Sequence, residues 1–204
     1  MFDLVILSAD KDQESALKGL LDSPQKLGIH PIHYKTITHP HRDPGCLRQS
    51  HDLLRPFLTS ARYSLVVLDV EGSGSGQSQR AGVEAEVEQL LSQNGWNERV
   101  RCIAISPELE AWIWSRSANL PSILGWTEPV PLYDWLESEG HLAAGQSKPT
   151  DPKAALKSVL KKARRPASSS IFGEVARKVS YASCQDEAFK KLLITLRGWF
   201  THSP

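Results

Sequence analysis

The chain has 204 residues, of which 24 are lysine or arginine and 23 are aspartate or glutamate, so its formal net charge at neutral pH is +1. This length suffices for one full domain with a buried core and is too short for two large independent ones. The balanced charge excludes a bulk positive field that attracts nucleic acid everywhere, so any nucleic-acid contact must come from a local basic patch.

The cysteines and the N-terminal residues indicate the compartment. Cys46, Cys102 and Cys184 are widely spaced and odd in number, and they match neither a disulfide framework nor a zinc pattern such as C-x-x-C. The apolar run from Leu4 to Leu7 has no basic leader and is too short for a signal sequence or a membrane span. We therefore expect a cytoplasmic protein with no membrane partner.

Four apolar segments have the character of buried strands, each bounded by polar or turn-forming residues. They are residues 2–7, 29–37, 63–70 and 100–105. Apolar residues at helical spacing lie between them, as at Val83, Val87 and Leu91. Strand and helix thus alternate about four times, which predicts an α/β fold with a mostly parallel four-stranded sheet flanked by helices.

The rest of the chain departs from this alternation. From Thr150 onward only helical patterns occur, beginning with Asp151-Pro152 as a helix cap and first helical residue. The expected organisation is an α/β domain over residues 1–120, an irregular junction over 121–149 and a helical extension over 150–204 packed on the same domain.

An acidic pair, Asp69 and Glu71, follows the most apolar strand. Ligands of open parallel sheets bind at the carboxyl ends of the strands. Residues two apart in an extended chain point the same way, so both carboxylates could hold Mg²⁺. The loop over residues 72–76, Gly-Ser-Gly-Ser-Gly, lets a phosphate approach the backbone but lacks the lysine of a P-loop. A solvated strand end followed by a flexible loop explains these residues equally well.

A second acidic pair, Glu108 and Glu110, follows the last strand, where Ser106-Pro107 predicts the beginning of a helix. The helix dipole favours acids in a first turn, which explains them without a function. This turn should nevertheless emerge at the same edge as Asp69, so either glutamate could complete a metal site. Asp10, just past the first strand, is a further acid at that edge and a candidate for proton transfer.

Residues 39–45, His-Pro-His-Arg-Asp-Pro-Gly, are predicted to form a loop because turn-forming residues dominate them. His41 could act as a general base, and Arg42 or Arg80 could bind a phosphate, although histidines in such loops are more often simply exposed. After Pro152, basic residues recur on one face of the expected helix, and this row could follow a phosphodiester backbone or be an ordinary solvated face. The row consists of Lys153, Lys157, Lys161 and Arg164.

Two sequence strings, LVVLDVEGSG (65–74) and ISPELEAWIWS (105–115), resemble Toprim-like small proteins of prokaryotic defence islands. With HRDPGC, NGW, LGW and the tail CQDEAFKKLLITLRGWF, the chain is similar over nearly its whole length to the small accessory component of methylation-associated phage defence systems. The Toprim resemblance covers about the first 120 residues. It implies that Asp69, Glu71 and either Glu108 or Glu110 take the places of that family's metal-binding acids.

The resemblance further implies a cytoplasmic antiviral-defence component, a Mg²⁺-dependent nuclease or phosphotransfer enzyme that acts on DNA or RNA beside other defence-system proteins. The glutamate that Toprim enzymes carry after the first strand is missing, since the turn reads Ser8-Ala9-Asp10, and Asp10 would have to replace it. A non-catalytic adaptor that binds partner proteins or DNA therefore remains an alternative. A nucleotide-sensing module is a third, which requires a pocket above residues 72–76 lined by Arg42 or Arg80.

Overall fold

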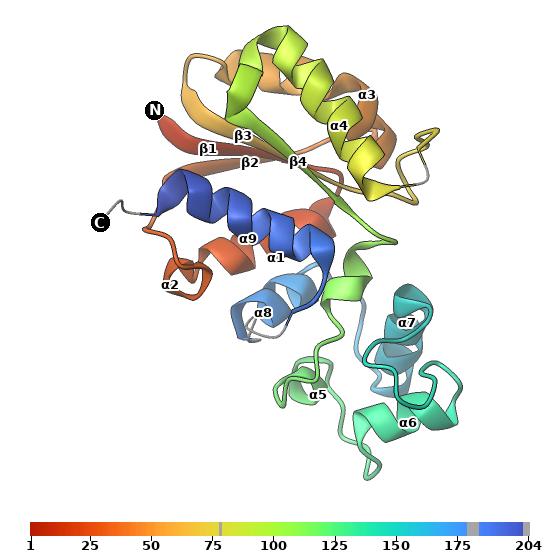
Figure 1. The fold of residues 1–204 in the computed structure, drawn as a ribbon. Helices are drawn as coiled ribbons and strands as arrows, with labels where there is room; N and C mark the ends of the chain where they lie inside the picture. The colour runs from red at the N-terminus through yellow and green to blue at the C-terminus, as the bar shows by residue number, and fades with distance from the viewer. Residues whose placement is uncertain (78, 179–183, 202–204) are drawn as a thin grey trace.

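The chain forms an α/β structure around one four-stranded sheet (Figure 1). The computed structural model describes residues 1–77, 79–178 and 184–201. The strands pair in parallel in the order β2-β1-β3-β4, which confirms the predicted parallel sheet flanked by helices. Their bounds are β1 (Phe2–Ser8), β2 (Tyr34–Thr38), β3 (Ala61–Asp69) and β4 (Val100–Ile105).

The sheet is buried on both faces, as the continuous apolar strands predict. Side chains alternate along β1, so that Leu4 and Ile6 belong to the core on one face and Val5 and Leu7 to the core on the other. The two central strands, β1 and β3, have almost no exposed apolar surface. This is why each contains a continuous apolar block, residues 4–7 in β1 and 65–68 in β3, without alternating polar residues.

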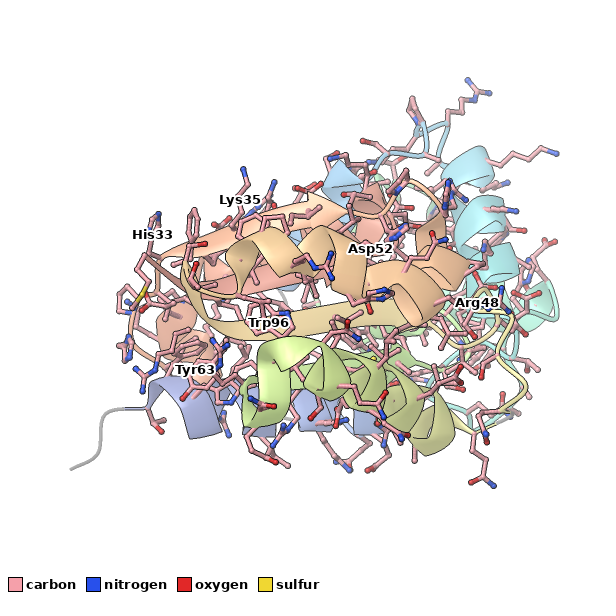
Figure 2. The ribbon with its side chains drawn as sticks, turned by 90° about the horizontal axis from the view of Figure 1, so that it is seen from above. His33, Lys35, Arg48, Asp52, Tyr63 and Trp96 are labelled. Atoms are coloured by element: carbon pink, nitrogen blue, oxygen red, sulfur yellow. The ribbon has the colours of Figure 1, made fainter. Side chains whose placement is uncertain are left out.

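Helices cover the two faces unequally (Figure 1). One face carries α3 (Arg42–Leu54) and α4 (Arg80–Leu91), which lie side by side in Figure 2. The other face carries α1 (Lys11–Leu21), α8 (Ser170–Lys178) and α9 (Glu187–Phe200). The last two come from the expected C-terminal helical extension, so that part of the chain completes the core of the sheet domain.

Further helices lie beyond the carboxyl ends of the strands or connect the main elements (Figure 1). The group below β4 in that view consists of α5 (Leu120–Ile123), α6 (Leu132–Ser138) and α7 (Pro152–Lys162). The short connecting turns are α2 (Pro24–Leu27), η1 (Arg55–Phe57), η2 (Ser92–Trp96), η3 (Asn97–Arg99) and η4 (Leu109–Trp112). The part expected to be an irregular junction thus contains two short helices.

The predicted loop over residues 39–45 is wrong from Arg42 onward, because α3 begins there. The first turn of α3 packs closely on the residues that precede the helix. A β-carbon at Gly45 would lie 2.1 Å from Nδ1 of the buried His39, so only glycine fits. Gly45, which predicts a turn in the sequence, is therefore a residue of α3 that must be glycine because His39 packs against it.

Two other predicted boundaries differ from the structure. The second strand begins at Tyr34 and not at residue 29, and the backbone before it is used elsewhere, since the His30 N–H bonds the Phe200 carbonyl at the end of α9. The helix expected from Ser106-Pro107 is only the 3₁₀ turn η4, with Glu108 preceding its first residue. Among the described helices, none is both long and apolar enough to cross a membrane.

Candidate metal centre

An acidic side chain follows each of the four strands within a few residues of its carboxyl end. Asp10 follows β1, Asp43 lies in the first turn of α3 after β2, Asp69 ends β3, and Glu110 lies in η4 after β4. Because parallel strands end at one edge of the sheet, these acids from four segments converge there, and the charges of the other three act on Asp69. Asp69, on a central strand, is the middle of the cluster.

Two contacts hold Asp69 in place. Its Oδ1 accepts a hydrogen bond of 3.0 Å from Nε2 of Gln13, which is 1% exposed. The Gln13 amide is itself fixed, since its Oε1 accepts a bond of 2.9 Å from the Ala9 N–H. The backbone N–H of Asp69 donates to Asp43 Oδ1 at 2.7 Å, so Asp43 is joined to the end of β3. The Asp69 carboxylate is thus oriented before any ligand binds.

Burial, together with the charges of Asp43, Glu110 and Asp10, raises the pKa of Asp69 to about 8, against a hydrogen bond from the Leu109 backbone that lowers it. Burial likewise raises the pKa of Asp43 and of Glu110. At neutral pH Asp69 therefore keeps its proton unless a positive charge enters the cluster. A bound cation would supply that charge.

Three of the acids are spaced as metal ligands. Asp69, Glu108 and Glu110 each offer one carboxylate oxygen, and these oxygens all lie within 4.8 Å of one another. Oxygens on opposite sides of a bound ion are about 4 Å apart for Mg²⁺ and about 5 Å apart for Ca²⁺. An all-oxygen set at this spacing fits a hard divalent cation such as Mg²⁺ or Mn²⁺ with small side-chain adjustments.

Glu108 also connects the cluster to α7. Lys153 Nζ forms an ion pair with Glu108 Oε2, which places a cation beside the three carboxylates. Glu71 lies in the turn after β3, where a hydrogen bond with Glu108 raises the pKa of Glu71. A pocket of about 340 Å³ opens between these acids and the beginning of α7, and Lys153 and Lys157 line it. The carboxylate cluster therefore borders an open space with two lysines.

The structure brings together some of the acids that the sequence predicted as metal ligands and leaves one outside. Asp69, Glu108 and Glu110 come together, whereas Glu71 is exposed and outside the 4.8 Å group. The extended chain expected through Asp69 and Glu71 ends at Asp69, where a turn begins, and Glu71 reaches the cluster through its hydrogen bond with Glu108. Both glutamates of the second pair belong to the cluster, although the sequence indicated only one of them.

The two residues predicted to transfer protons lie in different surroundings. Asp10 Oδ1 caps α1 by accepting bonds of 3.0 Å from the N–H groups of Asp12 and Gln13, which leaves the second carboxylate oxygen of Asp10 without this role. His41 is exposed at the beginning of α3, where its Nδ1 lies 3.0 Å from Oε1 of Gln49. Of the two, only Asp10 is close enough for its charge to affect Asp69.

The predicted phosphate-binding residues are spread over three regions. Arg42 is exposed at the beginning of α3. Arg80 forms an ion pair of 2.6 Å with the buried Glu84 on its own helix, so its charge is already used. The row Lys153, Lys157 and Lys161 lies along α7 as predicted, and Arg164 follows just beyond the end of that helix.

Sequence reasoning did not assign a site role to Asp43 or Gln13. In the sequence Asp43 stands in a stretch of turn-forming residues, and Gln13 looks like any residue in the first turn of a helix. The usable signal was topological, since both residues closely follow a predicted strand, as Asp10 and Asp69 do. Recognising that the ends of all four strands meet would have included them.

Comparison of the chain with protein-family models, with curated proteins and with solved structures found no match.

Proposed function

We propose that this chain is a divalent-metal-dependent enzyme that acts on phosphodiester groups of nucleic acid, as an intracellular component of a prokaryotic antiphage defence system. The observation that carries the metal-dependent chemistry is the group of oxygens from Asp69, Glu108 and Glu110 within 4.8 Å of one another. The defence context and the Toprim-like assignment rest on the sequence resemblance. The parallel sheet with its acids at the carboxyl edge is consistent with them.

In this proposal Asp69, Glu108 and Glu110 hold the cation. A bound Mg²⁺ or Mn²⁺ would polarise a phosphate oxygen and lower the pKa of a coordinated water. Lys153 and Lys157 line the adjoining pocket and bind the negative charge of the substrate phosphate. Gln13 keeps Asp69 in the orientation that the ion requires, by the hydrogen bond to Oδ1.

Proton transfer in this scheme falls to the free oxygen of Asp10. Its other oxygen fixes the side chain as the cap of α1, and its charge reaches both Asp43 and Asp69. An aspartate held in this way is pre-oriented toward the cluster and close to its charges. His41, in contrast, is paired with Gln49 on the surface of α3.

A Mn²⁺ titration followed by calorimetry tests the proposal directly. We expect wild type to bind one ion, and Asp69→Asn to weaken that binding at least tenfold because one charged ligand is lost. Glu98→Gln is the matched control, since Glu98 is exposed at the opposite end of the same sheet and should bind Mn²⁺ as wild type does. Absence of Mn²⁺ binding by wild type at millimolar concentration contradicts the proposal.

Cleavage assays extend the test to chemistry. Single-stranded and double-stranded DNA and RNA are incubated with wild type and Asp69→Asn in the presence of Mg²⁺ or Mn²⁺. Metal-dependent cleavage by wild type that Asp69→Asn abolishes supports the enzyme.

A non-catalytic adaptor is the second candidate, and two contacts favour it. Lys153 neutralises Glu108, and one oxygen of Asp10 is bound to the backbone of α1. Both contacts stabilise the cluster without a metal. If wild type binds nucleic acid or a partner protein but binds no Mn²⁺, the adaptor is favoured over the enzyme.

A further inference from the structure

A second, larger pocket lies between α6 and α7, at the far end of α7 from the carboxylate cluster (Figure 1). Its volume is about 760 Å³, within the range of sites that hold a small ligand or a nucleotide. We call it the α6–α7 pocket and define it by five of its lining residues, an aromatic pair and three cations. They are Trp135, His141, Lys161, Lys162 and Arg164.

The aromatic side of the α6–α7 pocket is rigid. The ring of Trp135 packs against Trp126 with centroids 5.0 Å apart and against His141 with centroids 6.2 Å apart. A tryptophan ring held between two neighbours offers a flat surface for stacking at little cost in side-chain entropy.

The basic side of the pocket has unused charge. Lys162 lies 3.7 Å from Glu128, a weak ion pair between two exposed groups. Within the residues that the structure describes, Lys161 and Arg164 have no acidic partner at ion-pair distance, and both are exposed. Glu128 and Glu139 also line the pocket, so its three cations outnumber its two acids. Two unpaired cations beside an aromatic surface are suited to an anionic, planar ligand.

Arg164 occupies a position that the backbone reserves for glycine. It follows Ala163, the residue that caps the C-terminus of α7, and has a φ of 51°, in the left-handed region. The N–H groups of Arg164 and Arg165 bond the carbonyls of Lys161 and Leu160, the pattern of a Schellman motif, in which this residue is usually glycine. A β-branched or long side chain is disfavoured here. The arginine therefore costs local stability, and its side chain lines the pocket.

The row of lysines joins this pocket to the carboxylate cluster. Lys153, Lys157 and Lys161 follow at intervals of four residues on α7, so neighbouring charges are about 6 Å apart along the helix axis. This interval is comparable to the distance between successive phosphates of an extended single strand. Lys153 and Lys157 line the pocket beside Glu108, and Lys161 lines the α6–α7 pocket.

We propose that the α6–α7 pocket binds one nucleotide of single-stranded nucleic acid, with its base against Trp135 and a phosphate on Lys161 and Arg164, and that the strand then follows α7 toward the carboxylate cluster. A paired base is stacked within its duplex and cannot enter such a pocket, which is the reason for choosing the single strand. The direction toward the cluster rests on the proposed function, whereas binding in the pocket does not.

Fluorescence anisotropy with a labelled ten-residue oligothymidylate, in EDTA, tests the pocket without any metal. We expect Arg164→Gly, Lys161→Gln and Trp135→Leu each to weaken binding at least fivefold. Arg164→Gly should melt at the same temperature as wild type or higher, so its loss of binding cannot come from unfolding. Lys35→Gln removes an exposed cation on β2, at a distance from α7 (Figure 2), and should change Kd less than twofold.

The salt dependence of Kd distinguishes a contact with phosphate from a purely structural role. The slope of log Kd against log salt should fall by about 0.7 for each cation that contacts a phosphate, so Arg164→Gly and Lys161→Gln should both show it and Lys35→Gln should not. Equal binding of a duplex of the same length, or displacement of the oligonucleotide by polyglutamate at equal charge, overturns the proposal. So does unchanged affinity in Arg164→Gly and Lys161→Gln.

Asp69→Asn separates this inference from the proposed function. It should bind oligothymidylate in EDTA with a Kd within twofold of wild type, since Asp69 does not line the α6–α7 pocket and carries a proton at neutral pH when no metal is bound. If wild type binds the oligonucleotide through Arg164 but binds no Mn²⁺, the enzyme proposal fails and the pocket stands. If Mn²⁺ binds and the oligonucleotide does not, the pocket fails and the metal centre stands.

Discussion

The raised pKa of Asp69 predicts that Asp69→Asn stabilises the metal-free protein and that the gain grows with pH. Burial and neighbouring carboxylates raise this pKa from 3.8 to about 8. Between these two values the folded state binds a proton that the unfolded state has lost, so the contribution of Asp69 to stability falls as pH rises through this window. Asparagine has no such proton, and its Oδ1 still accepts the Gln13 hydrogen bond.

The magnitude follows from the size of the shift. One pKa unit corresponds to about 1.4 kcal/mol, so the three pH units between pH 4 and pH 7 correspond to about 4 kcal/mol. Asp69 is partly exposed, and water near the carboxyl reduces this figure. We expect the advantage of Asp69→Asn over wild type to rise by about 2 to 4 kcal/mol between pH 4.5 and pH 8.

Urea unfolding in EDTA, followed by tryptophan fluorescence at several pH values, measures this difference. Each variant is compared with wild type at the same pH, so that titration of the other acids cancels. Glu98→Gln, at the opposite end of the sheet from Asp69, should show no pH-dependent difference in stability from wild type. A constant offset between Asp69→Asn and wild type over this range would refute the reasoning. Addition of Mn²⁺ should reduce or reverse the difference, because wild type binds the ion more tightly and gains more stability from it.

Three further predictions concern the same edge of the sheet. Mn²⁺ affinity should rise by about tenfold per pH unit between pH 6 and pH 8, because binding displaces the Asp69 proton, and calorimetry in buffers of different ionisation enthalpy should count about one proton released. Lys153→Gln should tighten Mn²⁺ binding several-fold, because it removes the cation that pairs with a ligand carboxylate; weaker binding would mean that the lysine orients this ligand. Gly45→Ala should lose about 1 to 3 kcal/mol of stability in urea unfolding, since a β-carbon there would lie 2.1 Å from an imidazole nitrogen, whereas Gly76→Ala, with no atom within 4 Å, should be neutral.

Several features of the fold were predictable because local chemistry decides them. Strands β1, β3 and β4 are buried on both faces, so they leave long apolar blocks that the sequence displays openly. Asp151 caps α7 as predicted, with its carboxylate accepting from the Ala154 N–H at 2.8 Å. These signals involve neighbours in sequence, which is why they can be read without the tertiary structure.

Other features depend on residues far apart in the chain. The beginning of α3 looked like a loop because Gly45 is a turn former in isolation, while its need is set by contact with His39. The second strand looked longer than it is because Ile29 and Ile32 are apolar, although of residues 29–33 only Ile29 is buried. This part of the chain contacts the end of α9. The His30 N–H bonds the Phe200 carbonyl, and Arg197 Nε donates a hydrogen bond of 2.7 Å to the Leu27 carbonyl, 170 positions earlier in the chain.

The sequence by itself determined that a parallel sheet exists and that acids follow its strands, because apolar blocks and turn residues are local properties. Only the tertiary structure decided which acids meet. Asp69 and Glu71 stand only two residues apart, yet Glu71 is outside the group, while oxygens of Asp69 and of the two glutamates after β4 come within 4.8 Å of one another. The physical reason is that strand pairing aligns the ends of distant segments, and this alignment leaves no trace in the residues next to Asp69 in the sequence.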